Sequence, residues 1–250
     1  ISAVLRESGF NAISVGKGGN GPLLELAALK EYAEPLKPKI VLWMYYEDGL
    51  VRFLNGEMQS SLLQKYLNET DFSQNLISRQ EEIDSLLVGY VEDEWERERE
   101  RETVRVGVRE KIIRIILIRN LRARINLTSK PNFSLFQAPT HKPIFKDILQ
   151  KAKQMVSGWG GRMYFVHLPP FGLYSKGIDQ FREFVLHTTT ELEIPIIDIH
   201  REVFVPHSDP LSLFSLRMRG HYNAEGYKLI AESISKRLKA DGIIPLNSRN

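Results

Sequence analysis

The 250-residue chain contains no cysteine, which excludes disulfides, thiolate chemistry and cysteine-ligated zinc sites. The chain also has little excess charge of either sign. Its formal net charge of +3 is too small to indicate nucleic-acid binding by itself. No run of about 18 apolar residues occurs, so no membrane-spanning helix is expected inside the chain. These absences leave the compartment open. A signal or anchor before Ile1 would place the protein in the cell envelope or outside the cell, and otherwise it would be cytoplasmic.

The chain has 42% hydrophobic residues, enough for the core of a single α/β domain over residues 1–250. Short apolar runs alternate with helical patterns, which is typical of a parallel sheet with helices on both faces. The expected strands are Ala12–Val15, Ile40–Tyr45, Met163–His167 and Ile194–Ile199. The expected helices are Ile1–Ser8, Leu23–Glu34, Phe145–Val156, Ile178–Leu192 and Ala224–Lys239. Ligands of such sheets bind at the carboxyl ends of the strands, so we expect the site residues there.

A long interruption, residues 50–143, follows the second expected strand. It is far longer than an ordinary connection between a strand and a helix. Helical patterns cover 54–67 and 74–90, and the mixed-charge run 92–102 favours an exposed helix with i,i+3 and i,i+4 ion pairs. We therefore expect a helical insertion within the domain. From its position after this strand, the insertion would act as a lid or a substrate wall.

The segment Lys111–Arg124 mixes arginines with branched aliphatic residues. These residues do not separate into two clean faces, and two interpretations stay open. A basic aliphatic helix can lie on an anionic membrane surface, so membrane contact through 111–124 is one interpretation. The other is a core helix whose arginines extend outward to solvent.

Near the C-terminus, the segment Gly220–Tyr227 places His221 in a short turn directly before an amphipathic helix. A histidine in a loop that leads into a helix lies at the rim of a fold, where a general base can reach a substrate. The alternative is a surface or helix-capping histidine. His221 is therefore a candidate base whose role depends on the rest of the chain.

A glycine-rich turn, Val15–Pro22, lies near the other end of the chain, between an apolar run and a helical pattern. Glycines there allow a sharp turn and bring backbone N–H groups close to an anion or oxyanion. The turn matches neither a phosphate-binding P-loop nor the dinucleotide fingerprint, so no cofactor is predicted. The alternative is a tight strand-to-helix turn without a ligand.

Together these segments resemble the SGNH/GDSL hydrolase superfamily of serine esterases and acylhydrolases. The turn Asn11–Pro22 is similar to the family's second block, Lys39–Glu47 to the strand entering its third block, and Gly220–Tyr227 to its fifth block. The resemblance implies a flavodoxin-like three-layer α/β/α fold with a parallel sheet. It also implies that His221 is the catalytic base and that Gly19 contributes a backbone N–H to the oxyanion hole, with the Asn20 side chain as a further donor.

The sequence departs from the family in its first block, because no Gly-Asp-Ser occurs. The chain opens at Ile1 in the helix that should follow this block. We therefore expect that the first strand is missing, that the nucleophilic serine lies upstream of Ile1, and that this chain alone is inactive.

The third and fifth blocks depart as well. Glu47-Asp48-Gly49 replaces the Gly-Asn-Asp that supplies a second oxyanion donor, and Met218 stands where an Asp often precedes the histidine. Asp209 is the best candidate for the acid that orients His221, although an Asp-Pro turn is the alternative. Glu47, Asp48 and His167 are candidates for lining the substrate pocket. Asp198 and His200 form an Asp-x-His pair without suitably spaced further ligands, so no metal site is predicted.

The resemblance implies hydrolysis of ester bonds, with O-acyl groups of a glycan or a lipid as candidate substrates and no nucleic-acid partner. A second hypothesis is a catalytically degenerate domain that kept the fold for binding or scaffolding. A third makes the charged and basic helices an adaptor on a membrane or a partner helix. The sequence does not indicate the oligomeric state.

Overall fold

The computed structural model describes residues 1–46, 53–106, 141–177 and 179–245. The chain divides into two units, one formed by 1–73 with 138–250 and the other by 74–137. The first unit holds β1 (Ile40–Tyr46), β2 (Arg162–Leu168) and β3 (Ile196–Asp198). Its helices in the described ranges are α1 (Ser2–Glu7), α2 (Pro22–Ala28), α3 (Leu54–Glu57), α4 (Ser61–Asn68), α7 (His141–Gly158), α8 (Phe171–Lys176), α9 (Arg182–Glu191) and α10 (Ala224–Ala240).

The three strands form one parallel sheet in the order β1-β2-β3. β2 is central and its residues after Arg162 are all buried, as expected for an uncharged apolar run between two neighbours. β1 pairs with β2 along its whole length, so that Tyr46 lies opposite Leu168. His167 lies opposite Asp198 at the carboxyl end of β3. The sheet therefore confirms an α/β architecture with parallel strands.

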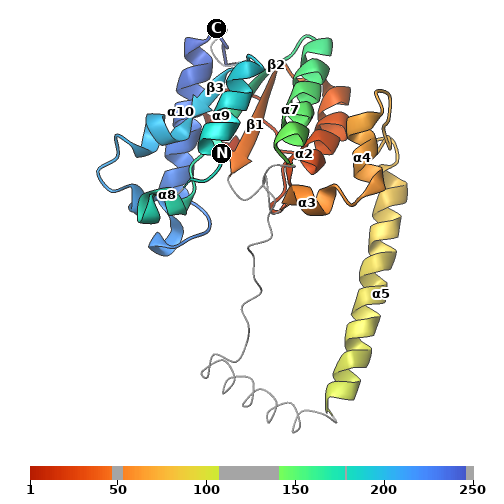
Figure 1. Cartoon of the computed structure of the whole chain (residues 1–250). Coiled ribbons are helices and arrows are strands. Elements are labelled where there is room, and N and C mark those ends of the chain that lie inside the picture. Colours follow the sequence, from red (N-terminus) through yellow and green to blue (C-terminus); the bar gives the residue numbers. More distant parts are fainter. Residues whose placement is uncertain (47–52, 107–140, 178, 246–250) are drawn as a thin grey trace. The chain divides into compact units, whose positions relative to one another are not determined.

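Helices cover both faces of this sheet (Figure 1). Because side chains alternate along a strand, Trp43 and Phe165 enter one core and Tyr164 and Val166 enter the other. The first core takes most of its helical residues from α2, α4, α7 and α9. The second takes most of them from α1, α10 and the π-helical turn η5 (His200–Phe204). Each face of the sheet is thus buried by amphipathic helices, as the alternating sequence pattern predicts.

The expected strand Ala12–Val15 is wrong, because residues 10–16 form no strand in the structure. Its apolar side chains are exposed, with Ile13 at 60% and Val15 at 41%. The physical reason is the lack of a ladder partner: within the described residues β1 pairs with β2 alone. An extended segment without a neighbouring strand leaves its backbone groups to water.

The expected insertion 50–143 is divided by the contact pattern. α3 and α4 belong to the first unit, where they lie near α2, whereas residues 74–137 form the second unit. The described part of the second unit is dominated by α5 (Gln80–Val106), the long yellow helix of Figure 1. An exposed i,i+3 pair between Arg97 and Glu94 agrees with the expected charge pairing on this helix. The segment 111–124 lies outside the described residues.

Over the ranges that the structure describes, no helix is long and apolar enough to cross a membrane.

Candidate functional site

The turn that carries His221 lies at the carboxyl ends of β1 and β2. Tyr46, the last residue of β1, donates a hydrogen bond from Oη to the Gly220 carbonyl over 3.4 Å. Tyr222 donates from its buried Oη to the carbonyl of Pro169, the residue after β2, over 2.6 Å. The residues on both sides of His221 are therefore tied to two strand ends, at the edge where parallel sheets bind ligands.

Backbone contacts fix the turn further. Ser215 N donates to His221 O over 3.0 Å, beside an antiparallel bridge between Phe214 and Tyr222. The next residue, Asn223, caps α10 by accepting from Gly226 N over 2.9 Å. Gly226 is required there, because a Cβ would stand 2.5 Å from the Leu213 carbonyl oxygen. The base of the turn is thus rigid.

The His221 side chain itself is exposed to solvent. Among the described residues its imidazole has no hydrogen-bond or ion-pair partner. The ring is accessible to a ligand that approaches the carboxyl edge of the sheet. A histidine so placed has the access that a general base needs, although nothing described fixes its tautomer.

Asp209, the predicted orienting acid, is held elsewhere. Arg217 Nη2 donates to both carboxylate oxygens of Asp209, over 2.9 and 2.8 Å. No hydrogen bond or ion pair between Asp209 and His221 occurs in the described part of the chain. The orienting role of Asp209 therefore gains no support from this geometry.

The glycine-rich turn places Gly19 and Asn20 before the N-terminus of α2. Gly19 has φ +91, a conformation that glycine adopts without strain, and it is exposed. α2 packs in the same core as Trp43 of β1. Its start is hydrogen-bonded to Glu57 of α3, the next described helix after β1. No described hydrogen bond connects Gly19 or Asn20 to His221.

Glu57 occupies the start of α2, a contact that the sequence did not predict. Its carboxylate accepts from Gly21 N over 2.6 Å and from Leu23 N over 3.0 Å. Burial raises the pKa of Glu57, and these backbone donors oppose the shift. The pKa of Glu25 is raised well above its usual value by burial and then by the nearby Glu57 carboxylate. The helix terminus is thus already satisfied, whereas the Gly19 N–H has no acceptor among the described residues.

The two acidic pocket candidates, Glu47 and Asp48, lie outside the described residues and stay predictions.

His167 is 1% exposed and does not face solvent, although the sequence predicts that it lines the pocket. It belongs to a buried polar cluster, which we define as His167, Asp179, Arg182 and Asp198. The ring lies between two carboxylates, with Nε2 3.5 Å from Asp179 Oδ2 and Nδ1 3.9 Å from Asp198 Oδ1. Arg182 donates to Asp198 Oδ2 from Nη2, and its backbone N–H donates to Asp179 over 3.0 Å.

The cluster is electrostatically unusual because the side chains of His167 and Asp179 are almost fully buried, at 1% and 3% exposure, while those of Arg182 and Asp198 are partly exposed. Burial, followed by the positive charge of Arg182, lowers the pKa of His167 to about 3, so the ring is neutral at pH 7. Burial raises the pKa of Asp179. Each of the four residues has one buried polar atom without a described hydrogen-bond partner: His167 Nδ1, Asp179 Oδ2, Arg182 Nη1 and Asp198 Oδ1.

Chemically, the cluster can fix the strand ends below the His221 turn, but a side chain with 1% exposure cannot contact a substrate. Sequence reasoning identified His167 and Asp198 as residues at strand ends but missed Asp179 and Arg182. Arg182 lies within a helical pattern of the sequence, where an arginine side chain is normally exposed to solvent. Only the packing of α9 on the sheet brings it to Asp198, and no local signal predicts that contact.

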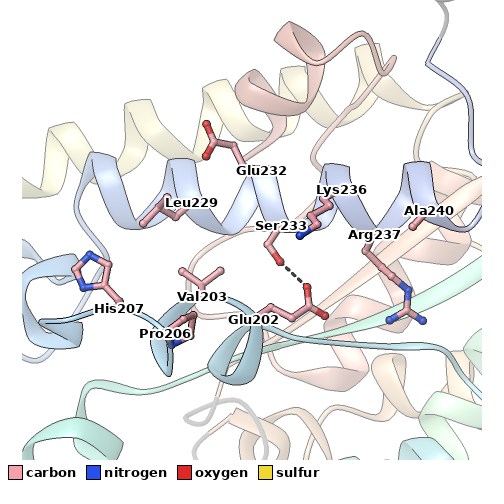
Figure 2. A pocket seen from close by; sticks show the side chains of 10 residues that line it. All are labelled: Glu202, Val203, Pro206, His207, Leu229, Glu232, Ser233, Lys236, Arg237 and Ala240. Atoms are coloured by element: carbon pink, nitrogen blue, oxygen red, sulfur yellow. Dashed lines mark hydrogen bonds between the residues drawn. The ribbon is translucent and has the colours of Figure 1, made fainter.

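A groove with a volume of about 640 Å³ is lined by residues of η5 and α10, together with Pro206 and His207. Figure 2 shows Ser233 hydrogen-bonded to Glu202 across it, over 2.6 Å, with charged side chains along its rim. None of the predicted site residues lines this groove.

In the part of the chain that is described, no three His, Asp or Glu side chains are arranged to hold a metal ion. Comparison of the sequence with protein-family models and curated proteins, and of the structure with solved structures, gave no match.

Proposed function

We propose that this chain is the larger part of an SGNH-type serine acylhydrolase with a flavodoxin-like arrangement of its sheet. The single observation that carries the proposal is the position of His221. Its neighbours Gly220 and Tyr222 are hydrogen-bonded to the ends of β1 and β2, and its ring is exposed. A rigid turn at the ligand-binding edge of a parallel sheet suits a general base.

The free edge of β1 supports a nucleophile supplied by an additional strand. β1 carries apolar and aromatic residues on both faces and has no charge or proline, the devices that usually protect an edge strand. Within the described residues its second edge has no ladder partner. A strand N-terminal to Ile1 would pair there, and its carboxyl end would bring a serine toward the His221 turn.

The proposed reaction is acyl transfer to water. The serine Oγ attacks the ester carbonyl carbon while His221 removes the hydroxyl proton. The tetrahedral intermediate collapses, and His221 returns that proton to the departing alcohol. Water then hydrolyses the acyl-enzyme with His221 again acting as base. The exposed Gly19 N–H would stabilise the oxyanion, and one such donor typically contributes about 2.7–4 kcal/mol. The Asn20 side chain would be a further donor, and Glu47 and Asp48 would border the pocket.

The substrate class follows from the same proposal. Esters of small molecules, and O-acyl groups of a glycan or a lipid, present the carbonyl that this chemistry requires. The test uses the longer protein, expressed from the start codon upstream of Ile1, and measures hydrolysis of p-nitrophenyl acetate. His221→Ala should lower kcat by about 10³-fold or more, because the serine loses its base.

His187→Ala provides the matched control. His187 lies on α9, is exposed and pairs only with Glu191 among described residues. It should retain full activity. Hydrolysis that survives His221→Ala, or an upstream segment without serine, would contradict the proposal.

A catalytically degenerate binding or scaffold domain is the second candidate. It is favoured by Asp209, whose carboxylate is paired with Arg217, so that His221 has no orienting acid among the residues that the structure describes. This candidate predicts no turnover by the longer protein even when every strand is present.

A further inference from the structure

α5 exposes a broad apolar face. We define the α5 apolar face as Ile83, Leu86, Leu87, Tyr90 and Val91, which recur at helical spacing of three and four residues. Leu86, Leu87 and Tyr90 are 64%, 56% and 64% exposed. Single exposed apolar residues are ordinary, but a contiguous face of large ones marks an interaction surface.

The charges beside this face restrict its partner. Residues 80–96 contain seven acidic residues and no Lys or Arg: Glu81, Glu82, Asp84, Glu92, Asp93, Glu94 and Glu96. Two of these acidic residues have a described ion pair: Glu82 pairs with Arg79, and Glu94 pairs with Arg97. An anionic membrane surface would be repelled by this stretch, and so would the same stretch of a second copy in parallel register. The complementary surface is aliphatic and basic.

We propose that the α5 apolar face is a docking site for a basic amphipathic helix of a partner protein. The partner's aliphatic stripe would cover Leu87, Tyr90 and their neighbours, and its Lys and Arg residues would flank the seam beside the acidic residues. This inference is independent of the acyl-transfer proposal, because it uses no residue of the His221 turn.

A labelled, designed amphipathic peptide that shares no segment with this chain is a suitable probe. It carries Leu at helical spacing along one side and Lys along the other, which is the required chemistry. Fluorescence anisotropy measures its binding to the full chain. We expect saturable binding that weakens as salt is raised, together with a blue shift of Trp95 emission, identified by comparison with Trp95→Phe.

Two variants add the same charge to opposite sides of α5. Leu87→Asp places it on the apolar face and should weaken binding by about tenfold or more. Ser85→Asp places it on the opposite side, where Ser85 is exposed, and should leave binding unchanged. Circular dichroism of both variants should show unchanged helix content, which separates loss of binding from loss of the helix.

Several results would overturn the proposal. Peptide binding that is absent, or equal in Leu87→Asp and the unsubstituted chain, removes the docking site. Self-association lost in Leu87→Asp identifies a second copy as the occupant. Trp95 emission that is already blue-shifted without peptide shows that the chain covers its own face. Binding of the chain to anionic vesicles that depends on Leu87 identifies a membrane.

Discussion

At the level of single residues, the buried polar cluster makes the fold sensitive to acid. His167 has a pKa of about 3 in the folded chain, mainly because burial disfavours the charged ring. The pKa of a histidine in the unfolded chain is near 6.5, so below that pH the ring is protonated in the unfolded state but still neutral in the folded state. The stabilising contribution is complete above about pH 6.5 and is lost progressively as the pH falls toward 3.

His167→Gln removes this titration while keeping a polar side chain of similar size. The free energy of unfolding of the unsubstituted chain should fall more steeply than that of the variant between about pH 6.5 and 3, by up to ~1.4 kcal/mol per pH unit. Denaturant unfolding at several pH values measures the difference. Groups such as Asp179 titrate in both proteins, so their contributions to the difference between the two unfolding free energies cancel. Parallel pH profiles would show that His167 is not held neutral.

The acids near the two histidines show what sequence can and cannot reveal. Asp209 is the nearest acid upstream of His221 in the sequence, but in the structure its partner is Arg217. Asp179 has no local signal in the sequence, yet it lies 3.5 Å from His167. Side-chain pairing between loops depends on tertiary geometry, and spacing along the chain carries little information about it.

At the level of elements, α2 depends on a carboxylate that comes from another helix. Glu57 accepts hydrogen bonds from Gly21 N and Leu23 N in a buried setting. Glu57→Ala leaves these donors unsatisfied and should cost about 1–3 kcal/mol of unfolding free energy. Glu57→Gln keeps one acceptor oxygen and should cost less.

Glu69→Ala, at the exposed end of α4, is the matched control and should change stability by about 0.5 kcal/mol or less. Urea unfolding of the three variants provides the comparison. Equal stability of Glu57→Ala and Glu69→Ala would mean that water satisfies the start of α2 as well as Glu57 does.

The elements also show where the sequence pattern succeeds. β1, β2 and α10 were predicted within two residues at their ends, because long apolar or amphipathic patterns and the Asn223 cap define them locally. The segment Ala12–Val15 has an equally apolar pattern but forms no strand, because a strand depends on its neighbours. α8 was missed, since it follows two prolines and has only six residues.

At the level of the whole molecule, the parallel sheet with helices on both faces was predictable from the alternation of patterns. The position of the His221 turn at the carboxyl edge follows from that architecture. The buried polar cluster was only partly predictable: strand ends identified His167 and Asp198, but their burial depends on how α9 packs.

The account as a whole requires that His221 activates a serine supplied by a strand beside β1. The most direct test treats the longer protein with a fluorophosphonate probe and maps the modified residue by mass spectrometry. We predict one labelled serine N-terminal to Ile1 in the protein with His221, and little or no label in His221→Ala. Label on a serine within residues 1–250, or equal labelling of both proteins, would contradict the account.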